Sequence, residues 1–315
     1  MRKAQAESLS WVFILVAGAI ILGFFVYFVF NLTESSSKKT ALQLSITLEE
    51  KMNAFALLND QYEKLMLPFA TSFEVTCDSL QVKDSPSSQA LHHIVFSPET
   101  IQGKEISIWT KRWNMPFQVA NFFYISNSNY QYVLIYDQQT KEFAESLFIP
   151  KIFSYEKKTQ YDFQELVQRS RTKNLIVVFF KEPSSKDLSL TQYAKVLSVN
   201  GNEEKGRIIF HNEGKSKDYA GEELLIGSII SGESSDYECS FNRALEKLKI
   251  LTYIYNSKAE KLAQKTEDCD NIYSGISSTL SQYGNMKGAQ EISNTAQILK
   301  NENDKLRGEG CVQVF

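Results

Sequence analysis

The segment Asn174–Phe180 (NLIVVFF) is a continuous apolar run of strand length, and Tyr132–Tyr136 (YVLIY) is a second one. Between them, residues 139–148 and 161–172 have the spacing of amphipathic helices. Apolar strands that alternate with such helices are typical of a central sheet covered on both faces. The two runs therefore predict an α/β or α+β fold whose mixed sheet, with flanking helices, is at least partly parallel.

Further strands are predicted on both sides of these runs. The upstream ones are Phe73–Val82, His92–Phe96, Ile106–Trp109 and Phe117–Ile125, and the run at Tyr132–Tyr136 belongs to a strand over Tyr130–Tyr136. Downstream, Gly206–Phe210 (GRIIF) and Leu224–Ser231 (LLIGSIIS) are predicted strands, and Leu188–Val196 fits either a helix or a strand. An aromatic cluster is predicted to lie in the core rather than on an exposed recognition surface: Trp109, Trp113, Phe117, Phe122, Phe123 and Tyr124.

The last quarter of the chain has the pattern of three amphipathic helices. Their apolar stripes run over residues 241–262, 272–283 and 292–306, and Gly308 and Gly310 are suited to end the last helix. We therefore expect a mixed α/β domain over residues 71–235 and a helical hairpin or three-helix region over residues 236–315 that packs on it.

Near its start the chain contains an uncharged apolar segment, Trp11–Phe30 (WVFILVAGAIILGFFVYFVF). Twenty helical residues span about 30 Å, the thickness of the hydrocarbon core of a bilayer. The segment predicts one transmembrane helix over residues 11–30, with the lipid bilayer as a partner. Arg2 and Lys3 in the lead, residues 1–10, favour a cytoplasmic N-terminus and an extracytoplasmic body.

Apolar residues recur at steps of three and four from Leu44 to Leu65, before Pro68. This spacing predicts an amphipathic stalk helix over residues 40–67. If the stalk continues the membrane helix, the two form a rod of about 85 Å. The alternative is two helices with a hinge at the serines, residues 35–37.

Four cysteines are present, and none of them forms a CxxC motif. Their spacing does not fit a zinc site, whereas two disulfides fit an extracytoplasmic domain. Four reduced thiols in a cytoplasmic domain are the alternative. If residues 240–266 form one helix, Cys239 and Cys269 lie about 40 Å apart and cannot pair. Two pairings remain: Cys77–Cys239 with Cys269–Cys311, or Cys77–Cys269 with Cys239–Cys311.

The sequence contains no recognisable catalytic constellation. The net charge of −3, without a dominant basic patch, argues against nucleic-acid binding. HExxH, GxSxG, GxGxxG and a complete P-loop are missing, so we expect no enzyme, catalytic residue, cofactor or metal. Adjacent carboxylates such as Glu222-Glu223 are expected to diverge, Glu203-Glu204 to lie in a solvated loop, and His92-His93 to point to opposite faces of a strand.

The lead, Met1 to Glu7, resembles an archaeal class III signal peptide of the type found in type IV pilins, which a prepilin peptidase processes. The resemblance implies Arg2 and Lys3 as the basic pair, Ala4–Gln5 as the processing site and Glu7 as the acidic residue. Ala4 stands where glycine is commoner, and Glu7 comes earlier than the usual acidic position. The whole chain is also similar to large single-pass membrane proteins of small-genome (DPANN) archaea, which often begin Lys-Ala-Gln; this similarity implies a setting and no activity.

Together these features predict a membrane-anchored, extracytoplasmic structural or interaction protein. A pilin-like surface component is one form of it, with protein partners bound through the outer domain or the anchor helix. The alternative is a membrane-tethered ligand-binding or sensor domain, which requires a deep pocket with convergent polar groups.

Overall fold

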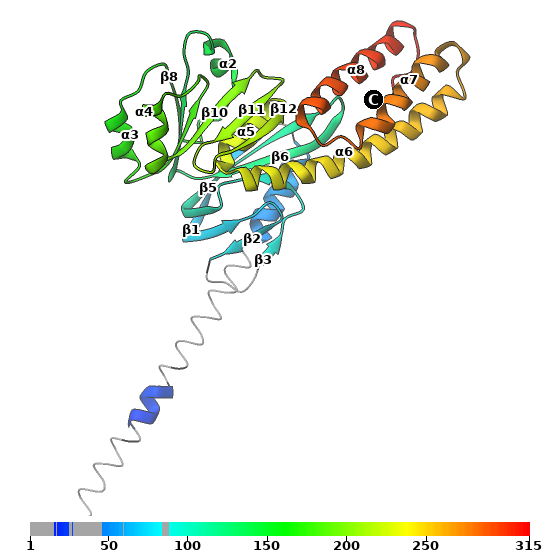
Figure 1. The fold of residues 1–315 in the computed structure, drawn as a ribbon. Helices are drawn as coiled ribbons and strands as arrows, with labels where there is room; N and C mark the ends of the chain where they lie inside the picture. Colours follow the sequence, from blue (N-terminus) through cyan, green and yellow to red (C-terminus); the bar gives the residue numbers. More distant parts are fainter. Residues whose placement is uncertain (1–15, 17, 25–26, 28–45, 59, 84–87) are drawn as a thin grey trace, which may run out of the picture.

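A computed structural model describes residues 16, 18–24, 27, 46–58, 60–83 and 88–315. The fold is a mixed α+β arrangement of two six-stranded sheets with helices, and four helices form its C-terminal part (Figure 1). The α+β class predicted from the sequence is therefore confirmed, with two sheets in place of the single one expected.

The first sheet, sheet A, has the strand order β3-β2-β1-β5-β6-β4. Its strands are β1 (Tyr62–Val75), β2 (Ser79–Val82), β3 (Ser88–Ala90), β4 (Ile94–Phe96), β5 (Thr100–Asn114) and β6 (Gln118–Ser126). All neighbours are antiparallel except β4 and β6, which are parallel. The long hairpin partners β5 and β6 carry the aromatic cluster, and all six of its side chains are buried, as predicted.

The second sheet, sheet B, has the strand order β12-β11-β10-β9-β7-β8. Its strands are β7 (Tyr130–Ile135), β8 (Tyr155–Lys158), β9 (Asn174–Phe179), β10 (Lys195–Gly201), β11 (Lys205–Phe210) and β12 (Lys215–Ala220). Strands β8, β7, β9 and β10 are parallel, and β11 and β12 continue the sheet in antiparallel fashion. The two apolar runs that predicted a partly parallel sheet are the adjacent strands β7 and β9.

Short helices connect the parallel strands of sheet B. They are α2 (Lys141–Ser146), α3 (Phe163–Arg169), α4 (Ser185–Leu188) and the 3-10 helix η1 (Ser189–Gln192). Asp162 begins α3 by accepting a hydrogen bond from the backbone N–H of Gln164, which satisfies one of the free donors of the first turn.

The C-terminal part consists of α5 (Glu222–Ser231), α6 (Ser234–Ala263), η2 (Glu267–Cys269), α7 (Asp270–Tyr283) and α8 (Ala289–Gly308). Helix α6 is 30 residues long, and its first half packs on β4 and β6 while its second half packs on α7 (Figure 1). Helix α6 begins at Ser234, close to the expected start of the helical region at residue 236, but α5 precedes it from Glu222. Helix α6 packs on sheet A through rings such as Tyr237 and Phe241.

Residues 224–231 form helix α5, and the prediction of a strand there was wrong. All eight residues from Leu224 to Ser231 are buried. A segment buried on all sides has no polar face, so its pattern cannot distinguish a helix from a buried strand. Glycine at position 227 lets α5 pack closely on β4, since a Cβ there would lie 2.7 Å from the ring of Phe96.

The stalk helix predicted over residues 40–67 differs from the structure in its second half. In the described residues the helix covers 46–56, and β1 begins at Tyr62. From there the exposure alternates, with Leu65 and Leu67 partly buried against the core and Lys64 and Met66 exposed. The spacing of three and four favours a helix in this stretch, but pairing with β5 outweighs it and decides the structure.

Most of the segment 11–30 lies outside the described residues, as does the lead with Ala4 and Gln5. Residues 18–24 are helical. Among the residues that are described, no helix combines the length and the apolar character needed to cross a membrane.

Candidate functional site

The four cysteines lie in two pairs that join distant parts of the fold. Cys77, after β1, lies against Cys239 of α6, with 5.8 Å between the Cα atoms. Cys269 of η2 lies against Cys311, which follows α8, with 6.7 Å between the Cα atoms. These separations lie within the range that disulfides span. The structure has the first of the two pairings that the sequence left open, and no cysteine is unpaired.

Arg243 strengthens the link between α6 and sheet A beside the first pair. Its Nη1 donates to the carbonyl oxygens of Cys77 and His93, the latter at 3.0 Å, and its Nη2 donates to that of Leu91 at 2.7 Å. One guanidinium thus satisfies three backbone acceptors at the end of the sheet. Because charged donors make the stronger hydrogen bonds, this contact fixes α6 against the segment that leads into β4.

Sheet B has a point at which its strand order reverses, where sheets of this kind bind ligands. The connection from β7 leads outward to β8, and that from β9 leads the other way to β10, so the strand order reverses between β7 and β9. In such sheets ligands bind outside the carboxyl ends of the strands at this point. Here Asp137 follows β7, and its Oδ1 accepts hydrogen bonds from the backbone N–H groups of Gln139 and Thr140 and from the Thr140 hydroxyl.

The loop after β9 is closed in the same way. Asp187 and Ser184 form a reciprocal capping box at the start of α4, and the hydroxyl of Tyr161 donates to Asp187. Burial acts to raise the pKa of Asp187, but the hydrogen bonds from Tyr161 and Ser184 outweigh it, so the pKa is lowered. In both loops these backbone N–H groups donate to side chains of the protein itself.

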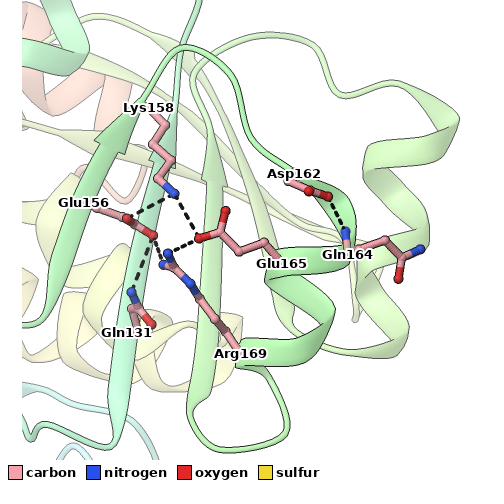
Figure 2. A network of polar contacts seen from close by, with 7 residues as sticks. All are labelled: Gln131, Glu156, Lys158, Asp162, Gln164, Glu165 and Arg169. Atoms are coloured by element: carbon pink, nitrogen blue, oxygen red, sulfur yellow. Dashed lines mark hydrogen bonds and ion pairs between the residues drawn. The ribbon is translucent and has the colours of Figure 1, made fainter.

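A charged network covers the outer part of sheet B (Figure 2). Lys158 and Arg169 each contact both Glu156 and Glu165, with Lys158 Nζ at 3.2 Å and 3.7 Å from the two carboxylates. Gln131 adds a hydrogen bond to Glu156 at 3.4 Å. Two cations and two anions neutralise one another, so the network serves to join β8 to α3 and has no unmatched charge for a ligand.

A cleft lies where the two sheets meet α8. Its walls are residues 114–116 between β5 and β6, residues 203–205 between β10 and β11, residues 221–223 at the start of α5, and one side of α8 over residues 293–301. The space between them is about 540 Å³. We call it the junction cleft, since each of its walls belongs to a different part of the fold.

Two carboxylates enter the junction cleft from the first turn of α5. Gly221 precedes them with φ of +84°, a conformation that glycine adopts at little cost. A Cβ on Gly221 would lie 2.8 Å from Glu223 Oε2 and 3.1 Å from the side chain of Met115. Glycine is therefore required here twice, for the backbone turn and for the close approach of Glu223.

The two carboxylates have different partners. Glu222 forms an ion pair with Lys111 of β5 and accepts the backbone N–H of Phe148 at 3.2 Å. Burial raises the pKa of Glu223, while its own backbone N–H and Lys111 act in the opposite direction and Glu222 adds to the rise. Lys111 forms its ion pair with Glu222, and in the described part of the chain no ion pair joins Glu223 to a cation of its own.

Polar contacts hold the remaining walls together. The ammonium group of Lys205 donates to the side-chain oxygen of Asn294, and Ser293 Oγ lies 3.5 Å from the carbonyl oxygen of Glu204. These contacts fix the turn between β10 and β11 against α8. On the opposite wall, the hydroxyl of Tyr283 donates to the carbonyl oxygen of Met115 at 2.9 Å, which joins α7 to sheet A.

The charges of the junction cleft are mainly negative. Glu203, Glu204, Glu222 and Glu223 line it, opposed by Lys205 and Lys300. This arrangement suits a ligand that carries a positive charge or several hydrogen-bond donors. In the part of the chain that is described, no group of three or more histidine, cysteine or carboxylate side chains is arranged to hold a metal ion.

The structure revises two expectations about polar pairs. Glu222 and Glu223 were expected to diverge, but both line the junction cleft, because α5 begins at its rim and both side chains of the first turn reach it. His92 and His93 were expected to begin a strand and point to its opposite faces, but they precede β4, and both contact the helix of residues 46–56: His92 Nε2 lies 3.7 Å from Glu49, and His93 Nε2 lies 2.9 Å from Asn53 Oδ1. The cleft itself had no signal in the sequence, since its walls come from four separate segments.

Comparisons with protein-family models, with curated proteins and with solved structures find no match to this chain.

Proposed function

We propose that the chain is a membrane-anchored interaction protein whose folded part stands outside the cytoplasm and binds protein partners. The observation that carries the proposal is the pairing of all four cysteines, two of which tie α6 to sheet A. Disulfides form and persist in oxidising compartments and are rare in the cytosol. The anchor that would hold the domain there is Trp11–Phe30.

The exposure of the anchor supports its place in lipid. In the described part of the segment, Val16, Ile20, Ile21, Leu22 and Tyr27 are 52–68% exposed. Several neighbouring apolar side chains on a helix are not stable in contact with water, because covering apolar surface lowers the free energy. An acyl-chain environment covers all sides of such a helix at once.

Two experiments test this placement. In intact cells, added protease is expected to degrade the folded part, and a cytoplasmic marker protein is expected to survive. Degradation only after the cells are broken would contradict the proposal. Separately, sequencing of the mature N-terminus tests the pilin-like form: cleavage between Ala4 and Gln5 supports it, and an intact Met1 removes it while the anchor itself is retained.

The ligand-binding alternative is favoured by the junction cleft, which brings polar groups from both sheets and α8 to one space. In this version the bound molecule carries a positive group that is placed near Glu223, which no ion pair in the described part of the chain joins to a cation of its own. Binding of a cation there favours the ionised carboxylate, so affinity is expected to rise with pH through the pKa of Glu223.

A thermal-unfolding series tests the cleft. Cationic probes (lysine amide and putrescine) are expected to raise the Tm of the wild-type protein more than glutamate does. The substitution Glu223→Gln is expected to abolish that difference, while Glu142→Gln on the exposed surface of α2 retains it. Equal shifts for cationic and anionic probes, or equal shifts in both variants, would exclude the cleft as a cation site.

A further inference from the structure

Helix α6 has an exposed apolar patch in its second half. Ile250 is 62% exposed, Tyr253 74% and Ile254 54%. On the other side of the same helix, Leu248, Thr252 and Ala259 are buried, where α6 packs on α7. The second half of α6 therefore carries apolar side chains on two sides: one side packs in the core, and the side that faces solvent also carries large apolar groups.

Lysines continue this exposed side toward the end of the helix. Because successive residues of an α-helix turn by about 100°, residues three and four apart fall on one side. Tyr253, Ile254, Ser257, Lys261 and Lys265 line a shallow groove of about 440 Å³ together with Lys258 and Leu262. We call Ile250 and these groove residues the α6 face.

The charge of this stretch is opposite to that of the chain. Residues 247–265 contain five lysines and one glutamate, a net charge of +4, whereas the whole chain carries −3. The remainder therefore carries −7. Lys258 uses its ammonium group to hold the C-terminal segment, donating to the carbonyl oxygens of Gln313 and Val314. Lys261 and Lys265 line the groove and are exposed.

We propose that the α6 face docks on an anionic lipid surface. A helix that presents tyrosine and isoleucine beside lysines has the composition of helices that lie in the membrane interface, where apolar groups enter the acyl boundary and lysines contact anionic head groups. The face belongs to one helix and offers three large apolar side chains. A stable protein interface needs about 800 Å² from each partner, which so narrow a face does not supply.

The inference goes beyond the proposed function, since it concerns the orientation of the domain on the lipid. The junction cleft is lined by α8 and the two sheets and shares no residue with the α6 face. Docking through α6 therefore leaves the cleft open. A membrane-bound domain would then rest on α6 with its binding site accessible.

Lysine reactivity in vesicles tests the proposal. The full chain is reconstituted into vesicles of phosphatidylcholine alone or with 30% phosphatidylglycerol, acylated briefly with an N-hydroxysuccinimide ester, and mapped by mass spectrometry. Acylation of Lys261 and Lys265 is expected to be about fivefold slower or more in the anionic vesicles, as expected for about 1 kcal/mol of attraction for each lysine. The reactivity of Lys104 and Lys215, on the sheets, is expected to stay unchanged.

Variants and salt separate the possible occupants. The double substitution Ile250→Ser with Tyr253→Ser is expected to remove the protection, and 0.5 M salt is expected to reduce it. The control, Lys104→Gln with Lys215→Gln, is expected to retain it. Equal reactivity in both kinds of vesicle would overturn the proposal. So would protection that also appears in detergent and grows with protein concentration, which would indicate a second copy of the chain.

Discussion

The indole N–H of Trp109 donates a hydrogen bond of 2.8 Å to the carboxylate of Asp60. Trp109 is fully buried on β5, and Asp60 lies between the helix of residues 46–56 and β1, with φ of +57°. Aspartate is one of the few non-glycine residues that adopt positive φ readily, and Asp60 does so in the turn that follows the helix ending at residue 56. The contact therefore marks the place where the chain leaves the helix and joins sheet A.

Substitution of Asp60 is expected to separate the hydrogen bond from the backbone conformation. Asp60→Ala removes the acceptor of a buried indole and places alanine at positive φ, so we expect a loss of about 2–4 kcal/mol in the free energy of unfolding. Asp60→Asn keeps an oxygen acceptor and tolerates the same φ, so its loss is expected to stay below about 1 kcal/mol. Urea unfolding of both variants checks this, and equal losses would contradict the role of Asp60.

Two helical glycines are expected to respond in opposite ways to alanine. A Cβ at Gly227 of α5 would lie 2.7 Å from the Phe96 ring, whereas at Gly275 of α7 it would meet no atom within 4 Å. Gly227→Ala is therefore expected to destabilise the protein by about 1–3 kcal/mol through overpacking. Gly275→Ala is expected to stabilise it by about 0.5–1 kcal/mol, the helix preference of alanine over glycine. Thermal unfolding measures both, and a stabilised Gly227→Ala variant would show that α5 is packed less closely than described.

The two disulfides are expected to differ in their effect on stability. Cys77 and Cys239 are separated by 162 residues, and Cys269 and Cys311 by 42. Closure of the longer loop removes more entropy from the unfolded chain, so loss of the first pair is expected to cost about 1 kcal/mol more than loss of the second. Paired cysteine-to-serine variants in denaturant unfolding test this order. A larger loss from the second pair would mean that the unfolded chain is not restrained as the pairing predicts.

Asp236 is expected to make stability depend on pH. Burial, followed by the nearby Glu233, raises its pKa from 3.8 to about 7, against the smaller effect of Lys195. Between those pH values the folded state retains a proton that the unfolded state has lost, so the free energy of unfolding falls as the pH rises through this window. Asp236→Asn does not titrate and is expected to exceed the wild type above pH 7 and to match it near pH 4.

Denaturant unfolding at pH 4, 6 and 8 measures the difference between Asp236→Asn and the wild type. Asp162→Asn is a suitable control because that carboxylate is exposed at the start of α3. A difference for Asp236→Asn that stays constant across the three pH values would show that the carboxyl titrates normally in the folded protein.

The sequence predicted those elements whose apolar pattern has one interpretation. Strands β7 and β9 are short apolar runs between helices of clear period, and they lie at the centre of sheet B as expected. The segments of α5 and of β1 before Pro68 were assigned wrongly for physical reasons. In α5 complete burial removes the polar face that would reveal a helix. At the start of β1 the spacing of three and four favours a helix, but the hydrogen bonds that β5 supplies outweigh this local preference.

The candidate site was less predictable than the fold. The length of one helix was enough to exclude a pairing of Cys239 with Cys269, because the pitch of an α-helix converts sequence separation into distance. No comparable rule brings Glu223, Lys205 and Asn294 to one cleft, since their proximity depends on how two sheets and α8 pack. The prediction that Glu222 and Glu223 diverge was also wrong. It rested on the geometry of a single helix or strand, whereas the walls that bring both side chains into one cleft come from other segments.

Thiol labelling of intact cells tests the account most directly. A membrane-impermeant maleimide is applied to cells that express the full chain, with and without prior treatment with an impermeant phosphine reductant. The account predicts no labelling before reduction and labelling of the exposed Cys239 after it, without breakage of the cells. Labelling without reductant that appears only in broken cells would show reduced cysteines inside the cell and would contradict an extracytoplasmic, disulfide-linked domain.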